Sequence, residues 1–144
     1  MNETRMGRYA VGALALVATA VFVMRLMTGD IDRARHIFQG LVEGKRSVEW
    51  QIDWPRLTAL DTKVGDEYSK LPTDVEKRNY ARAFILKFAY GFRQGGGDLK
   101  AFTNWRTEPA SDSLTVVAAD YAAKQKTLLF QLSPEKKLVS MQWK

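Results

Sequence analysis

The chain of 144 residues contains no cysteine and only one histidine, His36. The absence of cysteine excludes disulfides, a thiolate nucleophile, a cysteine-ligated zinc site and lipid attachment to an N-terminal cysteine. A single histidine excludes metal sites built on two histidines and proton relays that pass through several. His36 also lies opposite the apolar stripe of its predicted helix, so we expect its side chain in solvent. These absences favour a protein with neither metal nor cofactor.

The sequence also lacks a phosphate-binding loop, although glycines occur in two short groups. Gly95, Gly96 and Gly97 follow a predicted helix instead of a strand, and no Gly-Lys-Ser/Thr ending follows them. The stretch at 40–45, GLVEGK, has three residues between its glycines where such a loop needs four. We therefore expect both groups to lie at helix ends.

Basic residues outnumber acidic ones, 22 to 16, but they do not gather in one run. They form small clusters such as Lys45-Arg46, Lys77-Arg78 and Lys136-Lys137. A nucleic-acid-binding domain would carry a basic stripe or patch, so no nucleic-acid partner is predicted. A solvated surface accounts for the charge, and contact with anionic lipid headgroups is the alternative.

The longest uncharged run lies near the N-terminus. Tyr9 to Met24 contains no charged residue, and Leu26 and Met27 continue the run past Arg25. As a helix, residues 9–27 would span roughly 28 Å, close to the bilayer hydrocarbon thickness of about 30 Å. The sequence therefore predicts a single-pass transmembrane anchor at 9–27 after a tail at 1–8. A cleaved signal peptide is the alternative, because residues 18–20, Ala-Thr-Ala, resemble a cleavage site.

The domain at 28–144 is expected on the outer side of the membrane. Basic residues flank the anchor on both sides and do not decide its orientation. A single N-terminal anchor most often leaves the following domain outside the cytoplasm, which favours a periplasmic or other extracytoplasmic location. A domain of this length can bury its own core without a metal or disulfide.

Three elements are predicted in the first part of that domain. Asp30 to Gly44 reads as a helix ended by glycine. Its apolar stripe consists of Ile31, Ala34, Phe38, Leu41 and Val42. Ser47 to Ile52 alternates between polar and apolar residues, which predicts a short strand. Trp54-Pro55 then predicts the start of a second helix, with a stripe of Leu57, Leu60, Val64 and Tyr68.

The clearest helix start is the capping box at 73–76, where Thr73 can accept from first-turn amides and Glu76 can reach back. The helix is expected to run to about Arg93. Its second half, Ala81 to Phe92, is apolar on most sides, with Phe84, Ile85, Leu86, Phe88, Ala89 and Tyr90. That composition predicts a helix buried in the crook of a curved sheet.

After the glycines the apolar period changes from 3.6 to 2, which is typical of strands. Four strands fit the pattern: Ala101–Thr107, Leu114–Ala122, Thr127–Leu132 and Lys137–Trp143. The short connections between them predict an antiparallel meander. The fold class is therefore α+β, with an anchor followed by a sheet packed on a long helix.

This order of elements resembles the nuclear-transport-factor-like (cystatin-like) α+β superfamily. The residues that carry the resemblance are the Ile31–Val42 stripe, the Ala81–Phe92 helix and the closing strand Lys137–Trp143. The resemblance implies a curved sheet around the long helix, with a conical cavity or a concave face. Membrane-anchored members of similar layout include inner-membrane scaffold subunits of type IV secretion machines, and the enzymes of the superfamily place acids or histidine in the cone.

Two carboxylates are candidates for a chemical or binding role. Asp120 shares a predicted strand face with Leu114, Val116 and Ala118, so it could be a cavity acid with a raised pKa if that face lined a cone. The alternative is a solvent-facing position at the end of the strand. Asp53, beside Trp50 and Trp54, could touch a ligand, although capping the next helix is the favoured role.

The sequence favours a non-enzymatic, membrane-anchored binding or assembly module, a small accessory subunit of a membrane-associated complex. Its partner would be another protein or a second copy. The tryptophans available for such an interface are Trp50, Trp54, Trp105 and Trp143, if they are exposed instead of filling the core. The alternative is a ligand-binding or enzymatic cone that uses Asp120, and a small-molecule ligand stays open.

Overall fold

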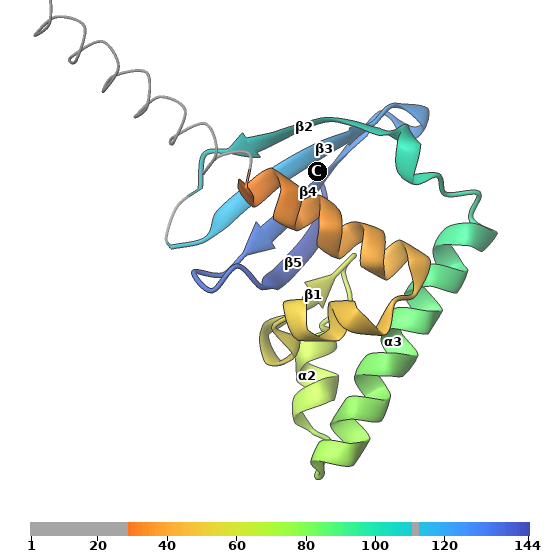
Figure 1. Ribbon diagram of the computed structural model, residues 1–144, viewed down its shortest axis with the longest axis vertical. Coiled ribbons are helices and arrows are strands. Elements are labelled where there is room, and N and C mark those ends of the chain that lie inside the picture. The colour runs from red at the N-terminus through yellow and green to blue at the C-terminus, as the bar shows by residue number, and fades with distance from the viewer. Residues whose placement is uncertain (1–28, 111–112) are drawn as a thin grey trace, which may run out of the picture.

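The computed structural model describes residues 29–110 and 113–144. A five-stranded sheet forms its centre, and a helix at 29–43 lies across one face of that sheet (Figure 1). Two further helices, α2 (Val64–Ser69) and α3 (Asp74–Gln94), lie together to one side. The arrangement confirms an α+β fold.

The four predicted strands are present and pair in chain order. They are β2 (Phe102–Glu108), β3 (Thr115–Tyr121), β4 (Lys126–Leu132) and β5 (Leu138–Trp143). Each is antiparallel to the next, so the meander is confirmed. A fifth strand, β1 (Thr58–Ala59), pairs in parallel with β5 and makes the sheet mixed, in the order β1-β5-β4-β3-β2.

The helix at 29–43 supplies the centre of the core. Ala34, Ile37, Phe38 and Leu41 are each at most 1% exposed. The Phe38 ring lies 4.9 Å from Phe102 and 5.3 Å from Phe130, measured between ring centroids, in edge-to-face geometry. The helix ends as predicted at Gly44, whose φ of 68° is the left-handed conformation that favours glycine at this position.

The predicted strand at Ser47–Ile52 is wrong. Residues Arg46–Gln51 form a 3-10 helix, η1, and only Ile52 makes a bridge, to Leu138. The side chains do not alternate between two faces, because Val48 is buried whereas Trp50 is 75% exposed. Val48 packs tightly against Gly40 of the preceding helix, which turns the segment back on that helix instead of toward the sheet.

The predicted second helix begins at the expected place but does not continue. It is split into a 3-10 turn η2 (Trp54–Arg56), the strand β1, and α2. Leu60 and Asp61 have φ values of 47° and 71°, which an α-helix cannot accommodate. Gly65 then donates its N–H to the Leu57 carbonyl at 2.9 Å and brings α2 against η2.

The N-terminus of α3 is confirmed, because the Thr73 hydroxyl accepts from the Glu76 N–H at 3.2 Å. Its predicted burial is wrong. Only Ala81, Ile85 and Ala89 are buried along α3, whereas Leu86 and Tyr90 are each 63% exposed. The helix at 29–43 already occupies the face of the sheet, so α3 packs with one side only, where the partly buried Phe88 and Phe92 also contact Phe38.

The predicted anchor at 9–27 and the tail at 1–8 lie outside the described residues. Within 29–110 and 113–144, no helix has both the length and the apolar character needed to cross a bilayer.

Candidate binding surface around Trp50

The four tryptophans occupy three kinds of position. Trp54 is 6% exposed and belongs to the core. Trp105 and Trp143 are partly buried and pack against that core. Trp50 is 75% exposed, the highest value among the exposed large hydrophobic side chains of the described residues. The structure therefore separates Trp50 from the other three.

Trp50 lies at a cleft of about 330 Å³ whose aromatic wall comes from three elements. Trp54 and Pro55 of η2 and Tyr68 of α2 line it together with Trp50 of η1. Trp54 is fixed in place, because its indole N–H donates to the Glu49 carbonyl at 3.0 Å. Its ring stacks on Tyr68 with 6.0 Å between centroids. The cleft thus has a rigid inner wall and an exposed Trp50 at its edge.

The charged residues of this cleft carry both signs. Glu49, Asp53 and Asp74 contribute carboxylates, and Lys77, Arg78 and Lys137 contribute cations. Lys77 Nζ lies 5.7 Å from the Tyr68 ring centroid, within the range of a cation–π contact. This mixture suits a polypeptide partner, which presents both kinds of charge.

Asp53 does not cap η2 with its side chain, contrary to the favoured role. Its backbone carbonyl accepts from the Arg56 N–H at 3.1 Å, and its carboxylate lies 3.7 Å from the Arg56 guanidinium. The carboxylate is therefore held at the cleft next to Trp54, by an ion pair that is too long for a hydrogen bond.

The exposed surface continues from Trp50 along α3. The segment before Trp50 runs beside this helix, with Glu49 Oε2 3.7 Å from Arg82 Nε. Nearer the C-terminus of α3, the Cα of Gly44 lies close to the side chains of Leu86 and Ala89. Arg78, Arg82, Leu86 and Tyr90 are spaced four residues apart, so each is the neighbour of the next along a row that turns by about 40° per step around α3. We call the exposed part of this region, Trp50 with Arg78, Leu86 and Tyr90, the Trp50 surface.

Asp120 lies on the opposite face of the sheet from the core. Its neighbours Val117 and Ala119 belong to the core cluster, so the alternation of β3 turns Asp120 the other way. Its carboxylate accepts from the Asn104 amide at 2.9 Å, from the Thr127 hydroxyl at 2.9 Å and from the Arg106 guanidinium at 3.1 Å.

These donors favour the ionised form of the Asp120 carboxyl group. The Asn104 amide first, then the Thr127 hydroxyl and the Arg106 guanidinium, lower the pKa of the Asp120 carboxyl below its ordinary value. A general base in a desolvated cone would have a raised pKa. The carboxylate instead ties β2, β3 and β4 together at the sheet surface.

His36 is exposed, as expected.

Comparison with known protein families, with curated protein sequences and with solved structures gives no match.

Sequence reasoning named Trp50, Trp54 and Asp53, which line the cleft, but missed the part of the Trp50 surface that α3 supplies. Leu86 and Tyr90 were assigned to the core because the second half of α3 is apolar on most sides. Arg78 carried no signal beyond belonging to a small basic cluster. Their grouping with Trp50 depends on the path of residues 44–50 along α3, which periodicity alone does not predict.

Proposed function

We propose that the chain is a membrane-anchored binding module that acts as a small accessory subunit of a membrane-associated complex. Residues 9–27 tether the module, and the domain extends from the membrane on the extracytoplasmic side. The apolar run Tyr9–Met24 supports the tether. The Trp50 surface contacts a protein partner that the tether keeps within reach.

The exposure of Trp50 at the edge of the cleft carries the proposal. An indole that is 75% exposed beside a prebuilt aromatic wall gains apolar burial only when a partner covers it. Tryptophan, tyrosine and arginine are the side chains most enriched at energetically dominant interface positions. Trp50, Tyr90 and Arg78 belong to these types.

The module is proposed to be non-enzymatic and cystatin-like. Its helix at 29–43 across four successive antiparallel strands supports the assignment to that superfamily. The pKa of Asp120 is lowered by three donors, which suits a carboxylate that braces the sheet better than one that takes up protons.

Site-specific photocrosslinking of the full chain in native membranes tests the proposal. A benzophenone amino acid replaces Trp50 in one variant and Lys124, an exposed residue of η4, in the control. We expect a discrete protein adduct from position 50 and none of the same mass from position 124. The mass of the adduct distinguishes another subunit from a second copy. No adduct at position 50, or the same adducts at both positions, would contradict the proposal.

A further inference from the structure

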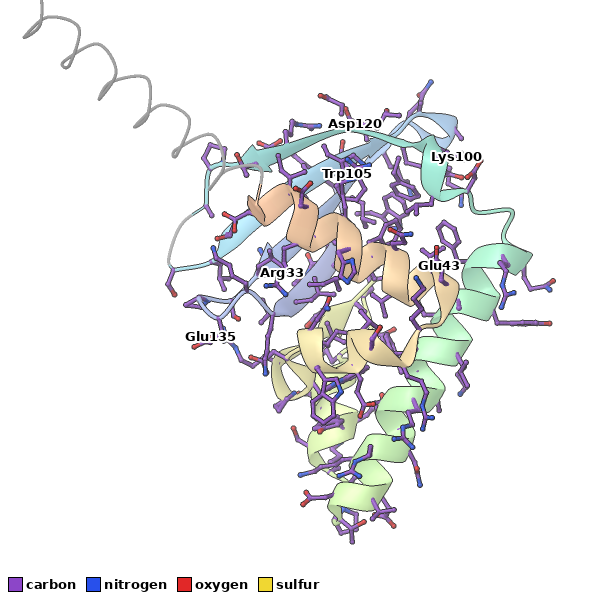
Figure 2. All side chains as sticks on the ribbon, in the orientation of Figure 1. Arg33, Glu43, Lys100, Trp105, Asp120 and Glu135 are labelled. Carbon is purple, nitrogen blue, oxygen red and sulfur yellow. The ribbon has the colours of Figure 1, made fainter. Side chains whose placement is uncertain are left out.

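Another cleft, of about 300 Å³, lies beside the helix at 29–43 and shares no lining residue with the cleft at Trp50. It is bounded by that helix, by the 3-10 turn η3 (Leu99–Ala101) and by the start of β2. Figure 2 shows Trp105 near the helix and β2, and Lys100 at η3. The lining residues are Arg35, Gln39, Leu99, Lys100, Phe102 and Trp105.

The charge of this lining is of one sign. Arg35 and Lys100 contribute two cations, and no lining residue is acidic. Among the described residues, neither cation has a carboxylate within 4.0 Å. Asp98 lies nearby in the chain, but its carboxylate accepts from the Lys100 backbone N–H at 3.0 Å and so caps η3. The lining therefore carries two cations that form no ion pair among the described residues, although the Asp98 carboxylate beside η3 keeps its negative charge.

The apolar wall of the cleft is prebuilt. The Trp105 indole N–H donates to the Phe102 carbonyl at 3.1 Å, and its ring stacks on Phe130 with 5.5 Å between centroids. The Arg35 guanidinium carbon lies 5.6 Å from the centroid of the Trp105 ring. The hydrogen bond and the stacking fix the ring before any ligand arrives, which lowers the ordering cost of binding, and the guanidinium lies within cation–π range of that ring.

We propose that this cleft binds an organic anion, with its carboxylate or phosphate held by Arg35 and Lys100 and its apolar body packed against Trp105 and Leu99. Two cations beside an aromatic and an aliphatic wall match a ligand that has a charged end and an apolar end. The volume is at the lower end of the range for small-molecule sites. The anion is either the headgroup region of a lipid or a soluble molecule, and this site is separate from the Trp50 surface.

Calorimetric titration of the full chain in phosphatidylcholine nanodiscs tests the proposal, with 1-naphthyl phosphate as the probe. We expect binding of this probe and much weaker binding of 1-naphthol, which lacks the anion, and of inorganic phosphate, which lacks the apolar body. Arg35→Gln and Lys100→Gln together should weaken binding by at least about tenfold, because each removes a charge-assisted contact.

The matched control is Lys87→Gln with Arg93→Gln, which removes two cations from α3, and it should bind like the parent chain. Unchanged melting temperatures show that each variant is folded. If an anionic phospholipid added to the nanodiscs competes with the probe, the ligand is a lipid headgroup. If the phospholipid does not compete, the ligand is a soluble anion. No binding of 1-naphthyl phosphate, equal binding by the Arg35/Lys100 variant, or equal binding of 1-naphthol would overturn the proposal.

Discussion

The helix at 29–43 and α3 differ in how they use their apolar residues. The first helix buries Ile37, Phe38 and Leu41 almost completely against the sheet. The second, α3, has 21 residues and is rich in large apolar side chains, yet Leu86 and Tyr90 remain 63% exposed on it. The first helix therefore places its apolar residues at the centre of the core, whereas α3 packs one side against that core and, with η1, leaves aromatic and aliphatic side chains at the surface.

If the Trp50 surface binds the proposed partner, stability and partner binding should depend mainly on different side chains. Removal of a side chain from the helix at 29–43 should lower the free energy of unfolding. Removal of a side chain from the Trp50 surface should weaken binding and leave that free energy nearly unchanged.

The largest effect is expected from Phe38→Ala. Phe38 is 1% exposed and contacts the rings of Phe102 and Phe130, so its loss leaves a cavity at the centre of the core. The free energy of unfolding should fall by about 3–5 kcal/mol. Chemical denaturation of the full chain in detergent, followed by near-ultraviolet circular dichroism, measures this. A loss below about 1 kcal/mol would show that the helix at 29–43 is not the centre of the fold.

Two adjacent residues of α3 give the sharpest contrast within one element. Ile85 is 2% exposed and Leu86 is 63% exposed. Ile85→Ala should lower the free energy of unfolding by about 2–5 kcal/mol, whereas Leu86→Ala should change it by no more than about 0.5 kcal/mol. The same denaturation experiment measures both. Equal costs at the two positions would place both side chains in the core.

Gly65→Ala tests the packing behind the cleft. A Cβ at this position would collide with the Pro55 carbonyl oxygen, so α2 and η2 would have to separate. Overpacking of this kind costs about 1–3 kcal/mol. Because Pro55 and Tyr68 line the cleft, the crosslink from position 50 should weaken along with stability. Gly91→Ala, at a glycine with open space around it, is the control, and it should lower neither the stability nor the yield of the crosslink from position 50.

The smallest effect concerns pH. Burial, together with the 2.7 Å hydrogen bond to the Glu67 carboxylate, raises the pKa of Tyr80 from 10.0 to about 12. Since the folded state holds the Tyr80 proton more tightly, the stability that comes from this group is complete below pH 10. It is lost as the pH rises toward about 12. Tyr80→Phe should reduce the slope of stability against pH in that interval, and an unchanged slope would contradict this pKa.

The sequence predicted those parts of the fold that depend on local pattern. The segments of β2 to β5 follow one another across short turns, so their antiparallel order follows from neighbouring residues. The Thr73 cap and the Gly44 helix end are likewise local. The strand β1 has two residues and depends on pairing with β5, so no local pattern could reveal it.

The sequence alone could not predict which of two similar segments would occupy a given place in the fold. Both helices carry apolar residues suited to the sheet, and only one can occupy its face, so the burial of α3 was wrongly predicted. The alternation at Val48, Trp50 and Ile52 resembles a strand, but contact of Val48 with Gly40 produces a 3-10 helix and turns Trp50 outward. The candidate binding surface depends on that turn and on the position of α3.

The most direct test of the account is Trp50→Ala, measured for both binding and stability. For the crosslinking, the benzophenone amino acid replaces Tyr90, and chains with and without the Trp50→Ala substitution are compared in native membranes. Denaturation of Trp50→Ala reports the stability of the fold. We expect that the Trp50→Ala chain loses the partner adduct while its free energy of unfolding changes by no more than about 0.5 kcal/mol. An undiminished adduct would contradict the proposed interface, and a large loss of stability would show that Trp50 serves the fold instead.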